Sequence, residues 1–148
     1  MAEPASDLKE KVRALRSEFE DALREVKDAP SLQALRDRFV GRALALLHQR
    51  PSAPWTIDDL SSQVGLSRSA LHERFVSLVG QPPVQYLTSW RMQLASRKLL
   101  EGRSSVATVA LDVGYDSEAA FARAFKRLVG MPPAAWRRSH ELGTQRAQ

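Results

Sequence analysis

Cysteine is absent from the 148 residues of this chain. Its absence excludes disulfide bonds, thiolate metal sites and thiol nucleophiles, and it is typical of a cytoplasmic protein. Long apolar runs are also missing, because none approaches the roughly 18 residues of a membrane-spanning helix. The N-terminal sequence MAEPASDLKEKVR has no apolar segment of a signal peptide. We therefore expect a cytoplasmic location and no contact with a membrane.

Groups that carry catalysis are sparse. The histidines His48, His72 and His140 are scattered without metal-ligand spacing, and no glycine-rich phosphate loop is present. A catalytic site needs a nucleophile, a base and an orienting group close together. We expect neither an enzyme nor a bound metal or cofactor.

Lysine is scarce where the positive charge is concentrated. Residues 1–30 hold 6 Lys and Arg against 8 Asp and Glu, whereas residues 31–148 hold 16 against 9. Of those 16 bases, only Lys98 and Lys126 are lysines. The planar guanidinium group suits phosphates and guanine edges, so an arginine-rich basic body is typical of a protein that binds DNA.

An internal repeat is the strongest pattern in the chain. The segment VGLSRSALHERFVSLVGQPPVQYL (64–87) is followed by VGYDSEAAFARAFKRLVGMPPAAW (113–136). Both copies have a second-position glycine, a central phenylalanine, a Leu-Val-Gly end and two prolines. The second copy carries one extra residue between its first glycine and the middle of its helix. Two copies are too few for a solenoid, so they predict two similar subdomains.

Helix start and stop signals divide the chain around this repeat. N-caps are expected at Thr56, Ser67, Ser104 or Ser105, and Asp116 or Ser117, and stops at Gly65, Gly80, Gly102, Gly114 and Gly130. No strand-like alternation is present, so we predict an all-α fold. Its parts are an N-terminal helix or interdomain linker (1–30), a first helix-turn-helix subdomain (31–82), a long linking helix (83–101), a second helix-turn-helix subdomain (102–140) and a disordered tail (141–148).

The apolar pattern also predicts which side chains are buried. One helix ending near Gln49 would bury Leu32, Leu35, Phe39, Ala43, Leu46 and Leu47, and the helix of the second copy would bury Ala120, Phe121, Ala124, Phe125 and Leu128. Over residues 7–27, Leu8, Val12, Leu15, Phe19, Ala22 and Val26 form a separate apolar seam. We interpret that seam as a helix packed on its own domain or on another one. A helix that forms a homodimer is the alternative.

A helix-turn-helix unit presents the outer face of its second helix to the DNA major groove. The core pattern leaves Ser69, His72 and Glu73 outside in the first copy, and Glu118, Ala119, Ala122 and Arg123 in the second. We predict that these residues contact bases: arginine can fork onto guanine, alanine can touch a thymine methyl group, and glutamate can accept from cytosine. Ser67, Arg68, Ser105 and Lys126 are predicted to contact phosphates.

Each of these residues also has a purely structural interpretation. An arginine on a helix face is usually solvated, and Glu73 can pair with Arg74 or Arg68 instead. The repeated frame favours DNA binding, and the linking helix, about 25 Å long, is of the right order to bridge grooves about 34 Å apart. The alternative function is a protein-interaction module that uses the 7–27 seam, with DNA binding secondary.

The paired turn glycines, the linking helix and the closing segment GMPPAAWRR resemble the DNA-binding region of AraC/XylS-type bacterial transcription regulators. The resemblance covers roughly residues 36–139, and VGYDSEAAFARAFKRLVGMPPAAWRR is similar to the signature of the family's second unit. The segments PWTIDDLSSQVGLSRSALHERF and YLTSWRMQLA resemble the branch that carries an N-terminal cupin-type sensor.

This resemblance implies sequence-specific binding to double-stranded operator DNA and contact with RNA polymerase, as an activator would make. By matching positions, the base-facing residues are those named above, and Lys126 and Arg137 fall where the family contacts phosphate. It also implies a sensor domain that this sequence lacks, with residues 1–30 as the end of an interdomain linker.

Overall fold

The computed structural model describes residue 10 and residues 30–146, with side chains as far as Glu141. The apolar seam predicted over residues 7–27 lies outside the described residues. Regular secondary structure in the described part is all helical, as predicted. The helices are α2 (Leu32–Arg36), α3 (Arg38–Gln49), α4 (Ile57–Val64), α5 (Arg68–Val79), α6 (Pro83–Leu100), α7 (Val106–Asp112), α8 (Glu118–Val129) and α9 (Pro133–Arg146).

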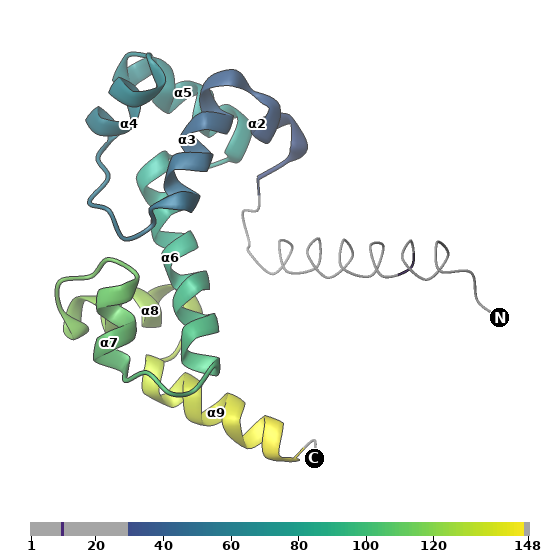
Figure 1. The fold of residues 1–148 in the computed structure, drawn as a ribbon, viewed down its shortest axis with the longest axis vertical. Coiled ribbons are helices and arrows are strands. Elements are labelled where there is room, and N and C mark those ends of the chain that lie inside the picture. The colour runs from purple at the N-terminus through teal and green to yellow at the C-terminus, as the bar shows by residue number, and fades with distance from the viewer. Residues whose placement is uncertain (1–9, 11–29, 147–148) are drawn as a thin grey trace.

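Two helical units share α6, which runs from one unit to the other (Figure 1). Helices α2 to α5 pack with one another, α3 and α5 also contact the start of α6, and α7 to α9 pack with its later turns. Each unit has its own apolar core, the first around Leu71 and Phe75 and the second around Phe121 and Phe125. The linking helix α6 therefore contributes side chains to both cores and does more than separate the two units.

Caps and glycines fix the two helix-turn-helix units as the sequence predicts. The hydroxyl oxygens of Ser67 and Ser117 each accept a hydrogen bond of 3.1 Å, from the N–H of Ala70 and of Ala120. The turn glycine of the second copy, Gly114, has a φ of 100°, which favours a residue without a side chain. The extra residue of the second copy lies in this turn, so α5 and α8 both have 12 residues. Their faces can be compared position by position.

The single helix expected to end near Gln49 is wrong. Asp37 ends α2, and its carboxylate accepts from the N–H groups of Phe39 and Val40 as the N-cap of α3. The break turns the apolar face, so Leu32 is 67% exposed and Leu35 44% exposed. Ala43 and Leu47 are buried as expected, and Phe39 and Leu46 are half-buried. The side chains buried in place of Leu32 and Leu35 belong to Ala34, Val40 and Leu44.

The same aspartate ties the first helices to α5. The Arg74 guanidinium donates to both carboxylate oxygens of Asp37, at 3.1 and 2.9 Å from Nε and 2.8 Å from Nη2. This hydrogen-bonded partner lowers the pKa of Asp37. Helix α5 is thus held by this exposed ion pair at its edge and by the apolar packing of Leu71, Phe75 and Val79 on its inner side.

Two further expectations are corrected at the C-terminal end. Leu128, expected in the core, is 48% exposed, because α8 turns it away from the buried side chains of Phe121 and Phe125. Helix α9 continues to Arg146, although we expected disorder from residue 141. Within the described residues no helix has the length and apolar character to cross a membrane.

Candidate nucleic-acid interface

The outer face of α5 carries the first group of predicted contact residues. Arg68, Ser69, His72 and Glu73 are all exposed, and Val76 is half-buried. Leu71, Phe75 and Val79 occupy the inner face and are buried in the first core. Because helix positions three and four apart share a face, the exposed residues form one surface on the first turns of the helix.

The outer face of α8 repeats this arrangement with different chemistry. Glu118, Ala119, Arg123 and Lys126 are exposed, and Ala122 is half-buried. Counting from the capping serines, Ala119 occupies the place of Ser69, Ala122 that of His72, and Arg123 that of Glu73. The first unit therefore offers polar and acidic groups where the second offers methyl groups and a guanidinium.

The α5 face is hollowed. A groove of about 390 Å³ is lined by Ile57 at the start of α4 and by Arg68, Ser69, His72 and Glu73. At its rim the Arg68 Nε lies 3.2 Å from an Asp58 carboxylate oxygen. Both side chains are about two-thirds exposed, so this pair contributes little energy and can open for a phosphate.

The residues predicted to contact phosphate divide into three kinds. Lys126 is exposed at the last turn of α8. Ser67 and Ser105 are exposed, and their hydroxyl oxygens already cap α5 and α7. Arg137 is different, because its Nε donates to the Leu99 carbonyl at 3.0 Å and its Nη2 to the Ser104 carbonyl at 2.6 Å. Its guanidinium braces α9 against the end of α6.

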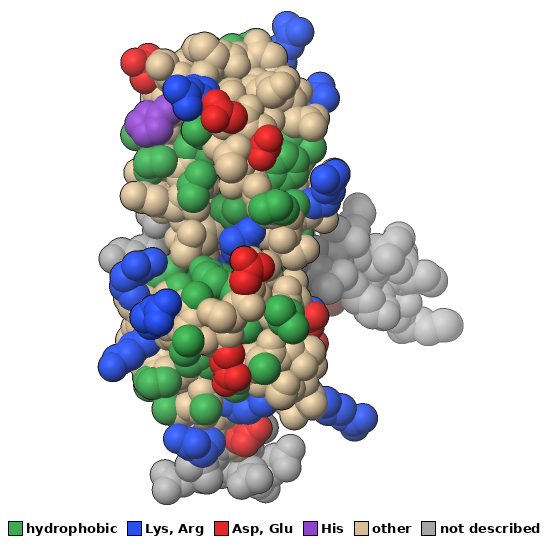
Figure 2. Space-filling view, turned by 90° about the vertical axis from the view of Figure 1, so that its left-hand side faces the viewer, with side chains coloured by type: hydrophobic (Ala, Val, Ile, Leu, Met, Phe, Trp, Pro, Cys, Tyr) green, Lys and Arg blue, Asp and Glu red, His purple; other side chains and the backbone are tan. Residues whose placement is uncertain are grey.

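Basic side chains gather unevenly over the surface. On the face shown in Figure 2, Lys and Arg side chains gather along one edge of the lower half, which the second unit forms. Within that unit, the last turn of α8 exposes two consecutive bases, Lys126 and Arg127. Acidic side chains lie among the basic ones in both halves of this face. The basic edge of the second unit would attract a polyanion.

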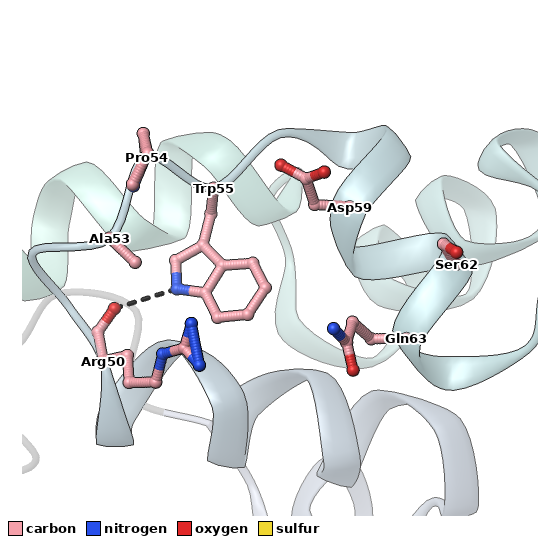
Figure 3. Close-up of a pocket in the computed structure, with 7 residues that line it drawn as sticks. All are labelled: Arg50, Ala53, Pro54, Trp55, Asp59, Ser62 and Gln63. Atoms are coloured by element: carbon pink, nitrogen blue, oxygen red, sulfur yellow. Dashed lines mark hydrogen bonds between the residues drawn. The ribbon is translucent and has the colours of Figure 1, made fainter.

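A second hollow lies beside the loop between α3 and α4 (Figure 3). It measures about 320 Å³ and is lined by Arg50, Ala53, Pro54, Trp55, Asp59, Ser62 and Gln63. The Trp55 indole N–H donates to the Arg50 carbonyl at 2.8 Å, and the Arg50 guanidinium lies 5.5 Å from the centre of the Trp55 ring. These contacts hold the loop in place, and nothing in the sequence pattern of the loop signals them.

Comparisons with known proteins agree with this geometry. The family described as helix-turn-helix domain matches residues 60–139, which is more than half of the chain. An AraC-like transcription regulator of Streptomyces lividans is 48% identical over 107 residues, covering 72% of this chain and 35% of that protein. The regulator AlkR of Acinetobacter baylyi is 36% identical over 118 residues, covering 79% of this chain and 39% of that protein. This chain therefore spans little more than a third of the length of these relatives.

Solved structures give the same likeness in three dimensions. The DNA-binding domain of the global transcriptional factor AdpA, crystallised with a target DNA, is 29% identical to this chain. The match has a TM-score of 0.69 and covers 76% of this chain and 98% of that domain.

Proposed function

Because this chain belongs to the AraC/XylS family of transcription regulators and matches the family's DNA-binding domain, we propose that it binds a promoter site with α5 and α8 in successive major grooves. The observation that carries the proposal is the repeated helix-turn-helix unit, whose capped second helices keep one face in the core and expose the other. The likeness to a domain solved with its target DNA supports it.

Each half-site would be read by a different set of groups. In the first unit, Ser69 and His72 donate to base edges and Glu73 accepts. In the second, Arg123 forks onto a guanine, Ala119 and Ala122 contact thymine methyl groups, and Glu118 accepts from a cytosine amine. Arg68 and Lys126 would bind phosphate, with Ser67 and Ser105 at the helix starts. Arg137 is left out, because its guanidinium is engaged by carbonyls of the chain.

The proposal includes partners beyond DNA. At a promoter, the bound domain would contact RNA polymerase, and it would act in the cytoplasm, where bacterial DNA lies. The relatives are long enough to hold a further domain, and a sensor domain of that kind would control DNA binding. Residues 7–27 would serve as a linker or a dimerising helix. The family consists of transcription regulators rather than enzymes, and a pure protein-interaction module is not favoured.

Selection from a pool of random duplexes, followed by salt titration on the selected site, tests the proposal. We expect a selected site long enough to span two major grooves. The logarithm of the binding constant should fall linearly with the logarithm of salt concentration, by about 0.9 for each phosphate contact. Selection of no sequence, or affinity that does not change with salt, would overturn it.

A further inference from the structure

Arg91 lies at the boundary between the two cores. On α6, Leu87 and Trp90 pack in the first core, whereas Met92 and Ala95 pack in the second. Between them the half-buried Arg91 side chain turns to the loop that joins α3 to α4. Its Nε donates to the Pro51 carbonyl at 2.8 Å, and its Nη2 donates to the Ala53 carbonyl at 2.8 Å.

The same loop touches the turn of the second helix-turn-helix unit. A Cβ atom added to Gly114 would lie 2.9 Å from the Ser52 Cα, 3.0 Å from the Ser52 carbonyl oxygen and 3.0 Å from the Arg91 Nη2. The Arg91 guanidinium also lies 5.8 Å from the centre of the Tyr115 ring. In Figure 1 the loop between α3 and α4 descends toward the turn between α7 and α8. We call Arg91, residues 51–53, Gly114 and Tyr115 the Arg91 junction.

The loop in this junction is itself braced. The Ala53 N–H donates to the Arg50 carbonyl at 3.2 Å, and the Trp55 N–H donates to the Ala53 carbonyl at 2.8 Å. The Trp55 indole closes the same loop from the other side (Figure 3). A loop held by these hydrogen bonds is rigid enough to fix one unit relative to the other, whereas a flexible loop would not be.

We infer that the Arg91 junction fixes the orientation of α5 relative to α8 and so sets the half-site spacing that the protein accepts. The inference rests on the proposed function, in which both helices enter the same DNA duplex. Helix α6 alone joins the units along one axis, about which they could rotate and bend. The junction lies off that axis, and a second point of attachment removes this freedom. Arg91 is thus a positioning residue that touches no DNA.

The spacing between half-sites that the protein accepts is a sensitive measure of how rigidly the Arg91 junction holds the two units. One inserted base pair moves the second half-site by about 3.4 Å and turns it by about 35°. A rigid protein must distort itself or the DNA to follow, whereas a loosened one can follow at little cost. Loosening also lowers the effective concentration of the second unit once the first is bound. The junction therefore affects spacing preference, while the recognition helices determine base preference.

A distance measurement without DNA tests the joint. Because the chain has no cysteine, Ala45→Cys on α3 and Ala107→Cys on α7 provide two unique sites for spin labels, both exposed. Pulsed electron paramagnetic resonance should give a narrow distance distribution in this background. Arg91→Met, which keeps a long side chain without donors, should broaden it at least twofold, and Arg91→Lys should restore part of the order. Arg97→Met, at an exposed position on the same helix, is the control and should leave the distribution unchanged.

Binding to the selected site and to versions with one base pair inserted or removed between half-sites then tests the consequence. Arg91→Met should lower affinity at the preferred spacing by about fivefold to tenfold and reduce the penalty for a changed spacing to about twofold, with base preferences inside each half-site unchanged. If Arg91→Met fails to fold, Arg91→Lys is measured in its place. The inference would be wrong if Arg91→Met left the width of the distance distribution and the loss of affinity at altered spacings unchanged. If the unsubstituted protein selected no site, the proposed function would be wrong instead. The spin-label distances would still show whether the Arg91 junction holds the two units in a fixed orientation.

Discussion

At the scale of single residues, Arg123 and Lys126 on α8 are both basic and both exposed, yet we expect different roles for them. Arg123 lies midway along the outer face, where a guanidinium can reach a guanine edge. Arg123→Ala should cost about 1–3 kcal/mol on the selected site and relax discrimination at one base pair. Lys126→Ala should weaken binding to all sequences alike and lower the salt slope by about one. Fluorescence anisotropy on specific and random duplexes measures both effects.

The two substitutions serve as controls for one another. Arg127→Ala, which removes the next exposed base on the same helix, gives a third comparison at equal net charge. If Arg123→Ala and Lys126→Ala behaved identically on specific and random DNA, the assignment of the outer face of α8 would be wrong.

His48 gives a prediction for pH. Its Nε2 lies 2.5 Å from the Tyr86 hydroxyl and its ring centre lies 4.6 Å from that of Trp90. Burial lowers the pKa of His48 below its usual value of 6.5, and burial raises the pKa of Tyr86 to about 12, so the tyrosine stays a neutral phenol. The unfolded chain therefore binds the His48 proton more readily, and the free energy of unfolding should fall as pH drops below about 6.5.

Chemical denaturation at pH 7.5 and at pH 5 would show this loss. His48→Phe keeps a ring in the same place and should reduce the difference between the two pH values. His72→Gln removes a histidine that is exposed on α5 and should leave the difference as it is in the unsubstituted protein. A pH dependence that survives His48→Phe in full would show that another group is responsible.

At the scale of elements, the two turn glycines are equivalent in sequence but differ in surroundings. Gly65 has a φ of 82°, and a Cβ atom added there would meet nothing within 4 Å, whereas one added to Gly114 would meet the backbone of Ser52. Gly65→Ala should cost about 1–2 kcal/mol of stability from the left-handed conformation alone. Gly114→Ala adds a steric clash with backbone and should cost about 1–3 kcal/mol more. Urea denaturation followed by circular dichroism measures the difference, and equal costs would contradict the close contact.

Local signals explain how much of these elements the sequence could predict. Capping serines and glycines act within four residues, so the bounds of α5 and α8 follow from the sequence, and so do their outer faces apart from Leu128, which the sequence predicts in the core. The break at Asp37 was missed because an aspartate inside an apolar pattern reads as one more exposed position. Asp37 caps α3 locally, through the N–H groups of Phe39 and Val40, but its ion pair joins it to Arg74, a partner 37 residues away. The roles of Arg91 and Arg137 were missed for the same reason, since their carbonyl partners lie 33 to 40 residues distant.

At the scale of the whole molecule, two separate cores on one helix explain why the repeat carries information. Each unit packs around its own apolar cluster, so residues on one outer face can change without altering the core of the other unit. The contrast between Ser69, His72 and Glu73 in one unit and Ala119, Ala122 and Arg123 in the other is of this kind. If both helices contact bases as proposed, two different outer faces on one chain favour a site without twofold symmetry, unlike the palindromes that symmetric dimers bind.

Inversion of one half-site tests that asymmetry. The two units follow one another in the same chain, and α6 joins the end of one to the start of the next. A second half-site turned to face the first would present its bases in the wrong order to α8. We expect affinity to fall to the level of a duplex with a single intact half-site, a loss on the order of 10²-fold. Exchange of the two half-sites, each kept in its original direction, should cause a similar loss, because α5 and α8 expose different groups. Gel-shift titration of the native, inverted and exchanged duplexes decides the point, and equal affinity for the native and inverted duplexes would mean that binding occurs through a symmetric pair of chains.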